Sequence, residues 1–336
     1  MKLIDVAIHA GVAPSTVSYV LTGNRKISAE TRTRVERSIR ELGFRPNSAA
    51  RSLRGNPTGV IGVAIPFRPE IHFPVMMQFV GSLVAAARAN DLDVLLLTST
   101  DAPGEIDRIR GTGTIDGLLV MDIDMQDQRL PLLRDFDRPV VLMGVPEERE
   151  GLTCVDVDFV AAGAACIDHL VTLGHRSIAI LGEPPALYRR GAGFAQRFMS
   201  GATEAAERRA ITLSTRGCKP TPERVSAALA GLDDDAPDFT AIVVHNELAV
   251  GPLLDALRAT GRRAPRDVSI VAMCSDEDAT RYTPRLTSVS TRSDEIGEKA
   301  ISLLVAKMAD QDVPSLTLLE PSVTRRGSSG RVPVPS

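Results

Sequence analysis

Residues 4–21 have the pattern of two short helices joined by a tight turn, and this feature constrains the chain more than any other. An apolar repeat indicates a first helix ending at Ala10, and Gly11 supplies a turn that a residue with a Cβ would make only at a cost. Pro14 suits the first turn of a second helix, because its φ is fixed and no N–H is needed there. The predicted shared core of the pair is Val6, Ala7, Ala10, Val12, Val17, Val20 and Leu21.

The second helix is predicted to turn its polar side chains outward. These are Ser15, Thr16, Ser18 and Tyr19. A short second helix with a free polar face is the arrangement of a recognition helix that enters a major groove.

Charge is distributed unevenly along the chain. Residues 1–55 hold ten Lys and Arg against four Asp and Glu, an excess of six positive charges. The remaining residues hold 29 basic and 38 acidic side chains, an excess of nine negative charges, so the net charge of −3 conceals the contrast. A basic head joined to an acidic body is typical of a nucleic-acid-binding module fused to a second domain.

A third helix is predicted after Ser28, which can cap its N-terminus. Val35, Ile39 and Leu42 lie on one face of this helix, and Gly43 is placed to end it. The following residues, 44–55, read Phe-Arg-Pro-Asn-Ser-Ala-Ala-Arg-Ser-Leu-Arg-Gly.

In order and spacing, residues 4–54 resemble the DNA-binding headpiece and hinge helix of the lactose-repressor (LacI/GalR) family of bacterial transcription regulators. The shared motifs are Asp-Val-Ala, the Gly-Val turn, Thr-Val-Ser, Leu-Gly-Phe-Arg-Pro-Asn and Ala-Arg-Ser-Leu. Further landmarks at residues 155–158 and 286–289 extend the resemblance to about residues 2–326. Each motif alone is weak, but together and in order they are specific.

The resemblance implies a set of major-groove contacts. Pro14, Ser15 and Tyr19 occupy positions that read base edges, while Thr16 and Ser18 occupy positions that contact phosphates. Many relatives have Arg at the position of Tyr19. Because Arg on guanine is the commonest specific contact, we expect this chain to read a different operator sequence.

The hinge is expected to contribute the remaining DNA contacts. Leu53 matches the leucine that family members insert into the minor groove, which kinks the duplex. Arg51 and Arg54 flank it, and Asn47 lies at the start of the same segment.

The rest of the chain predicts a two-lobed α/β body. Residues 56–336 exceed what one compact core usually holds. Runs such as 60–65 and 94–97 are continuously apolar, which is typical of parallel strands buried on both faces. The fold class is therefore α/β, with a helix-turn-helix headpiece and a two-lobed core like that of periplasmic binding proteins.

Family members cross between their lobes three times, which implies the divisions of this chain. The headpiece is expected at 1–45, the hinge helix and linker at 46–57, lobe one at about 58–157 plus 288–318, lobe two at about 158–287 plus 319–327, and a flexible tail at 328–336. The tail lacks the heptads that some relatives use to form tetramers, which favours a homodimer.

The cleft between the lobes is the expected effector site, because ligands bind beyond the carboxyl ends of parallel strands. By resemblance, Arg190 clamps polar groups of the effector, Asn246 lies in the pocket at a strand end, and Phe73, in the loop after the first strand, covers a sugar ring. Arg190 could also be a surface arginine, and Phe73 a core residue.

The main departure in the expected pocket is Cys274, where relatives usually carry a carboxylate. A thiol is a poor hydrogen-bond acceptor. We therefore expect an effector with fewer clamped hydroxyls than a neutral hexose, either a carboxylated or phosphorylated metabolite or a modified sugar. Asp276 could replace the carboxylate only if the loop is rearranged. The sequence is compatible with induction and with co-repression.

Other chemistry has little support in the sequence. The four cysteines show no Cys-x-x-Cys, so no metal, redox pair or cofactor is expected, and free thiols indicate the reducing cytoplasm. The sequence shows neither a signal peptide nor an apolar run long enough to cross a membrane. A solute-binding protein would have no use for residues 1–55. An enzyme would need a nucleophile and base in the cleft, where only His72 and His245 are candidates.

Overall fold

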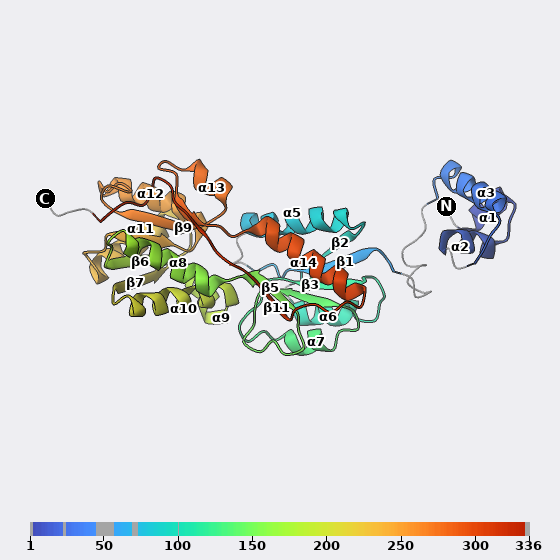
Figure 1. The fold of residues 1–336 in the computed structure, drawn as a ribbon, viewed down its shortest axis with the longest axis horizontal. Helices are drawn as coiled ribbons and strands as arrows, with labels where there is room; N and C mark the ends of the chain where they lie inside the picture. The colour runs from blue at the N-terminus through green and yellow to red at the C-terminus, as the bar shows by residue number, and fades with distance from the viewer. Residues whose placement is uncertain (1–2, 23–24, 45–56, 69–72, 100, 333–336) are drawn as a thin grey trace. The chain divides into compact units, whose positions relative to one another are not determined.

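The computed structural model describes residues 3–22, 25–44, 57–68, 73–99 and 101–332. The chain forms two compact units, Met1–Gly59 and Val60–Ser336 (Figure 1). The predicted hinge contacts Asn47, Arg51, Leu53 and Arg54 lie outside the described residues, as does His72. Those predictions therefore stay predictions.

The first unit contains the predicted helix-turn-helix. Gly11 makes the turn with φ of +63°, and Val12 N donates to Ala7 O at 3.0 Å. Ser28 caps the third helix by accepting from Thr31 N at 3.3 Å, and Gly43 follows that helix with φ of +59°. The first two helices are bent by 104° relative to each other, as in helix-turn-helix motifs. The helices are α1 (Leu3–Ala10), α2 (Pro14–Thr22) and α3 (Ala29–Glu41).

The core of this unit agrees with the prediction in all but one position. Val6, Ala7, Ala10, Val17 and Val20 are buried, and Val12 packs against them with part of its surface exposed. Leu21 was expected in this core, but it is 36% exposed, since it lies in the last turn of α2. The third helix closes the core with Val35, and Phe44 follows it.

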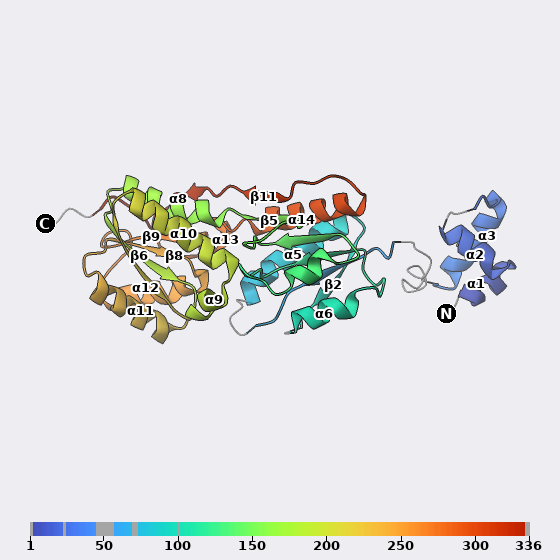
Figure 2. The same cartoon turned by 90° about the horizontal axis from the view of Figure 1, so that it is seen from below.

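Lobe one is a parallel six-stranded sheet in the order β11-β5-β4-β3-β1-β2, with β2 at one edge. Helices α5 and α14 pack together on one face, while α6 and α7 cover the other (Figure 1; α5, α14 and α6 are also labelled in Figure 2). Alternate residues of β3 and β4 therefore enter two different cores. The strands are β1 (Val60–Ala64), β2 (Asp93–Leu97), β3 (Gly117–Val120), β4 (Val140–Met143), β5 (Cys154–Val157) and β11 (Leu316–Leu319); the helices are α5 (Phe73–Ala89), α6 (Ala102–Ile109), α7 (Leu130–Arg134) and α14 (Ser293–Met308).

Lobe two repeats this architecture with the sheet order β12-β10-β9-β8-β6-β7, in which only β12 is antiparallel to its neighbour. Helices α8 and α10 pack tightly together on one face, and α11 and α12 cover the other. The strands are β6 (Ser177–Gly182), β7 (Thr212–Gly217), β8 (Ala241–Val244), β9 (Ser269–Met273), β10 (Thr287–Val289) and β12 (Val323–Thr324); the helices are α8 (Phe159–Thr172), α9 (Pro185–Arg190), α10 (Gly193–Arg208), α11 (Pro222–Asp235), α12 (Val250–Ala259), α13 (Asp276–Arg281) and the 3₁₀ turn η1 (Glu247–Ala249).

The chain passes between the lobes three times, after β5, after β10 and after β11. Two expected boundaries need correction. Ser288 and Val289 pair with β9 and β12, so they belong to lobe two. Residues 328–332 are not a free tail, because Ser328 is fully buried and Val332 N donates to Leu173 O at 3.0 Å.

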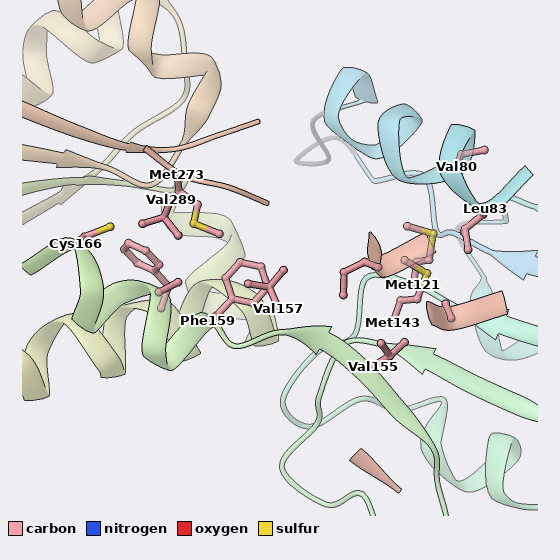
Figure 3. Packing of buried hydrophobic residues seen from close by; sticks show 14 of the residues in the cluster. Val80, Leu83, Met121, Met143, Val155, Val157, Phe159, Cys166, Met273 and Val289 are labelled. Carbon is pink, nitrogen blue, oxygen red and sulfur yellow. The ribbon is translucent and has the colours of Figure 1, made fainter. Parts of the chain in front are cut away.

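A hydrophobic cluster contains residues of both lobes (Figure 3). Met121, Met143 and Val155 come from lobe one, whereas Phe159 and Met273 come from lobe two. The apolar core therefore continues across the crossover that follows β5. Within the described residues, no single helix is long and apolar enough to cross a membrane, and only the bent pair α1 and α2 meets that length and composition criterion together.

Candidate DNA-binding surface and ligand cavity

The outward face of α2 is the candidate DNA-binding surface. Pro14 and Ser15 are exposed, and Thr16 and Tyr19 are half-buried. Ser18 was expected to face outward, but it is only 8% exposed, because it follows Val17 at the edge of the face that packs into the core. The predicted reading surface is therefore smaller than expected.

Arg25 adds a cation to this surface that the sequence reasoning did not single out. Its guanidinium lies over the ring of Tyr19, 5.6 Å from the ring centroid. A cation–π contact of this kind orients the arginine without neutralising it. Tyr19, which stands where many relatives have Arg, is therefore next to an arginine from the segment after α2, Arg25.

A cavity of about 170 Å³ lies where the carboxyl ends of the two parallel sheets meet. Its wall is mostly apolar, with a small number of ionisable side chains from each lobe. Lobe one contributes Val75, Met76, Phe79, Met121, Asp122, Ile123, Met143, Gly144, Asp156, Thr291 and Ile296; lobe two contributes Phe159, Glu183, Leu187, Arg190, Phe194, His245, Glu247 and Met273.

A buried ion pair shapes the loop of lobe one that faces the cavity. Arg129 is almost fully buried, and its Nη2 lies 2.6 Å from Asp127 Oδ2. The same guanidinium donates to the carbonyls of Met121 and Asp122 at 3.1 and 2.7 Å. Burial opposes ionisation of Asp127, but hydrogen bonds and charge from Arg129 hold its pKa below the usual value. Arg129 thus fixes the loop that presents Asp122 and Asp124.

Arg190, at the end of α9, joins lobe two to that loop. Its Nη2 lies 2.5 Å from Asp122 Oδ1, and its Nη1 pairs with Asp124. Arg68 of lobe one contacts the same two carboxylates at 3.4 and 3.2 Å. Burial raises the pKa of Asp124 and so does Asp122, whereas Arg190 and Arg68 oppose that rise. We call these four side chains the Arg190 cluster.

Backbone contacts reinforce the junction at the Arg190 cluster. Met125 N donates to Gly191 O at 2.7 Å, and Gly193 N donates to Ile123 O at 3.0 Å. A Cβ on Gly193 would lie 2.9 Å from Ile123 O, so a side chain there would push the two lobes apart.

Two more contacts cross the cleft. Asp156 on β5 accepts from Arg197 on α10 at 2.8 Å, and Gln78 on α5 donates to Asp278 on α13 at 3.4 Å. Burial raises the pKa of Asp156 to about 7, although Arg197 opposes that rise. The lobes are therefore held together by ionisable groups on both sides of the cavity.

Lobe two contributes two acids to the wall that the sequence reasoning did not identify. Glu183 follows β6 and Glu247 follows β8, and these strands are parallel neighbours. Burial raises the pKa of Glu183 to about 8, and Glu247 adds to the shift. Burial also raises the pKa of Glu247 to about 7. Their position directly after buried strands was the signal that could have revealed them.

Aromatic side chains line the same part of the wall. Phe194 lies between Phe159 and His245, with ring centroids 5.8 Å away on each side. His245 also stacks on Phe198 at 3.9 Å. Phe159 and Phe194 are both part of the cavity wall.

Of the four predicted effector contacts, the structure brings only Arg190 to the cavity. Phe73 is not in a loop but begins α5, where it is 51% exposed and packs edge-on against Phe67. Asn246 is fully buried, and its side chain points to Cys218 O at 3.4 Å. Cys274 is buried in the core of lobe two. None of these three lines the cavity.

The argument for an anionic effector therefore loses its premise. Cys274 removes no carboxylate from the wall, and four other carboxyl side chains line it, Asp122, Asp156, Glu183 and Glu247. The guanidinium of Arg190, which was expected to clamp polar groups of the effector, pairs with Asp122 and Asp124. Asp276 does not replace the missing acid either, because it lies in α13 and pairs with Arg326. Such a wall disfavours an anion.

No group of histidine, cysteine and acidic side chains in the described part of the chain has the arrangement of a metal site. All four cysteines are buried and free. Their burial raises the pKa of each thiol, to about 11 for Cys154 and Cys218 and about 12 for Cys166 and Cys274. The thiols are therefore unreactive core groups.

The headpiece and the bilobed core define a class, a DNA-binding regulator with a periplasmic-binding-like ligand domain. Residues 2–47 match the model of the lacI family of bacterial regulatory proteins, and residues 167–329 match the periplasmic binding protein-like domain. The HTH-type transcriptional regulator CelR of Thermobifida fusca is 30% identical over 326 residues, 94% of each chain. Catabolite control protein A of Staphylococcus aureus is 24% identical, over 96% of each chain.

Solved structures show the same fold. The lac repressor dimer bound to operator and the anti-inducer ONPF superposes with a TM-score of 0.85, at 24% identity, over 98% of this chain and 99% of that one. A complex of CelR with cellobiose gives 0.67 at 27% identity, with the same coverage. This chain belongs to the lacI family of bacterial transcription regulators, which are DNA-binding proteins rather than enzymes.

Proposed function

We propose that this protein is a repressor whose affinity for operator DNA is set by a small metabolite in the interlobe cavity. The observation that carries the proposal is the Arg190 cluster, which joins the lobes and whose members Arg190 and Asp122 line the cavity. A ligand that touches Arg190 or Asp122 must change the contacts that set the lobe arrangement. Its effect on DNA is bounded by its difference in affinity for the two arrangements.

On DNA, two chains would place α2 in successive major grooves. Pro14, Ser15 and Tyr19 would read base edges, and Thr16 would contact phosphates. A two-fold dimer reads a pseudo-palindromic site. The lac repressor structure, described as a dimer bound to operator, supports this arrangement by its similar fold.

Between the half-sites, Leu53 would enter the minor groove beside Arg51 and Arg54. Bending a duplex by such a wedge costs about 1–6 kcal/mol, so the bend must be offset by contacts of both hinges. A helix as short as 46–54 is unstable alone in water. Hinge formation would therefore depend on DNA, on the partner chain and on the lobes that follow it in the sequence. Binding to chromosomal operators implies a cytoplasmic protein.

An apolar surface of lobe one supports the homodimer. Strand β2 lies at the edge of its sheet, where Leu96 is 41% exposed, and Val84 on the adjoining α5 is 41% exposed. An edge strand with exposed apolar side chains is a ready surface for pairing. A second copy of the chain would cover this surface.

The metabolite is proposed to be compact and rich in hydrogen-bond donors, such as a sugar or a modified sugar. The carboxyl groups on the wall can accept from hydroxyl groups, and the aromatic rings can pack against a sugar face. The relative CelR was solved with cellobiose, which supports this class. The cavity is smaller than the about 300 Å³ typical of drug-sized ligands, so a small molecule fits best.

Fluorescence anisotropy with the promoter DNA of the protein's own gene tests the proposal. We expect specific binding by a dimer, inverted half-sites in a footprint, and a change in affinity with a metabolite that raises the melting temperature. Leu53→Ala should weaken operator binding and spare random DNA. Arg208→Ala, at an exposed position of α10 in lobe two, should alter neither. Protection of a single half-site, or equal loss on both DNAs, would contradict it.

A further inference from the structure

We propose that Glu183 and Glu247 form a subsite for a protonated amine, so that the metabolite sensed in the interlobe cavity is a small organic cation. This inference rests on the proposed function and deepens it, because it gives the class of the ligand. The amine could be carried by a sugar or by an aliphatic body, and the two sources share one recognition chemistry.

The two carboxyl groups are brought together by the topology of lobe two. Strands β6 and β8 run parallel as neighbours, with Leu181 opposite Val244. Glu183 comes one residue after β6, and Glu247 comes three residues after β8. Both side chains line the cavity.

Each of the two carboxyl groups has one buried oxygen without a partner among the described residues. Glu183 is only 5% exposed, and its Oε2 has no hydrogen-bond partner in the described part of the chain. Glu247 receives one hydrogen bond, from the backbone N–H of Ser275, and its Oε2 likewise has no described partner. A buried polar atom without a partner is costly and rare, which points to a group that arrives from outside.

The charge balance around the cavity favours a cation as that group. The acids Asp122, Asp124 and Asp156 pair with Arg68, Arg190 and Arg197. Glu183 and Glu247 have no such pair among the described residues. Acids without a cationic partner therefore lie on the lobe-two wall, and an ammonium group would stabilise their ionised form with three donors.

The surroundings of the two acids fit the rest of such a ligand. The rings of Phe159 and Phe194 lie on the same wall and can face a cation. The thioethers of Met76, Met143 and Met273 line the remaining space and adapt to varied apolar shapes. A compact body with one basic nitrogen matches this wall better than a fully hydroxylated ring.

Protonation gives the subsite a signature that a neutral ligand lacks. Burial and repulsion from Glu247 raise the pKa of Glu183 to about 8, and burial and Asp278 raise that of Glu247 to about 7, against the Ser275 N–H. An ammonium group stabilises the ionised carboxylates, so its binding should release protons near pH 6.5 and tighten as pH rises to 8. The other titratable groups around the pair are Tyr188, Cys218, His245, Cys274, Asp278 and Tyr282.

Two matched probe pairs test the subsite on the full chain. The first pair is n-butylammonium and 1-butanol, and the second is 6-amino-6-deoxyglucose and glucose. We expect an amine to raise the melting temperature and its hydroxyl analogue to do so much less. Calorimetry at pH 6.5 in two buffers of different ionisation enthalpy should show net proton release. Whichever of the two amines binds more tightly shows whether the natural ligand carries its amine on an aliphatic body or on a sugar.

The variants Glu183→Gln and Glu247→Gln keep the shape and remove the charge. Each should weaken amine binding by about tenfold or more, because a charge-assisted hydrogen bond is lost. Glu207→Gln, an exposed change on α10, should have no effect. Operator binding without ligand shows that each variant is folded. Proton release is measured on the wild type, so it tests the subsite even if a variant fails to fold.

Three outcomes would overturn the inference: neither amine binds, each hydroxyl analogue binds equally well, or the glutamine variants bind as tightly as the wild type. The proposed function has a separate criterion. If glucose or another neutral sugar binds and alters the affinity for promoter DNA, the proposed function stands and the amine subsite fails. If an amine binds through Glu183 and Glu247 but leaves DNA affinity unchanged, the subsite stands and the proposed function fails.

Discussion

Both walls of the interlobe cavity carry acids, but the acids of the two walls differ in whether they pair with a cationic side chain. On the lobe-one wall, Asp122 and Asp156 each pair with an arginine of lobe two. On the lobe-two wall, Glu183 and Glu247 have no arginine or lysine partner in the described residues. The contrast separates two tasks. The paired acids hold the lobes together without a ligand. The unpaired acids gain a partner, and so stabilise the protein, only when a ligand binds.

Removal of Arg190, the arginine that joins the two walls, should have the largest effect. Arg190→Met leaves two buried carboxylates with Arg68 as their remaining cation. We expect a loss of about 2–3 kcal/mol in the free energy of unfolding, below the full cost of an unpaired buried charge. Urea unfolding measures it, and Arg189→Met, an exposed neighbour, is the control. Equal small losses in both variants would show that the Arg190 cluster does not hold the lobes.

On the lobe-two wall, replacing the acid Glu183 by a neutral side chain should increase stability, whereas Arg190→Met decreases it. The pKa of Glu183 is raised from its usual 4.5 to about 8, so the folded state holds a proton that the unfolded state releases. The contribution of Glu183 to stability is thus greatest below pH 4.5 and is lost as pH rises toward 8. Glu183→Gln should flatten this fall and stabilise the ligand-free protein at pH 8 by about 2 kcal/mol. Melting temperatures from pH 5 to 8 test it; parallel curves for variant and wild type would contradict it.

The second interlobe pair gives a smaller, pH-dependent effect. Burial raises the pKa of Asp156 to about 7, so this acid is largely protonated at pH 5 and attracts Arg197 weakly there. Arg197→Met should therefore cost little at pH 5 and about 1–2 kcal/mol at pH 8, as the unpaired acid ionises. Arg208→Met, on the same helix and exposed, is the control for urea unfolding at both pH values. A loss that does not change with pH would show that packing of the Arg197 side chain dominates.

Local rules predicted the headpiece better than the cavity. The turn at Gly11 and the cap at Ser28 depend on neighbours within a few residues, so the sequence specifies them directly. The parallel sheets were also predictable from continuous apolar runs such as 60–65. Arg190 lies at the end of α9 and lines the cavity, where the resemblance placed it, and its contact with an effector stays a prediction.

Two errors in the cavity have a common physical cause. Asn246 and Cys274 were expected on the wall, and in each case a residue beside the predicted one is there instead: His245 and Glu247 in the first case, Met273 in the second. Consecutive side chains at a strand end point to opposite faces, so a shift of one residue moves a side chain from cavity to core. Resemblance placed the right strand ends, but it did not fix which face each residue takes.

The smallest expected effect concerns this one-residue shift. Cys274 belongs to the lobe-two core, whereas Met273 belongs to the wall. Cys274→Ala removes one buried sulfur and should cost about 1 kcal/mol in the free energy of unfolding, with the affinity for the metabolite changed less than about twofold. Met273→Ala should weaken that affinity more, because it removes a contact from the cavity wall. Calorimetric titration of both variants with the ligand that releases promoter DNA decides between them. If the cysteine variant loses more affinity than the methionine variant, then Cys274 faces the ligand, and its assignment to the lobe-two core is wrong.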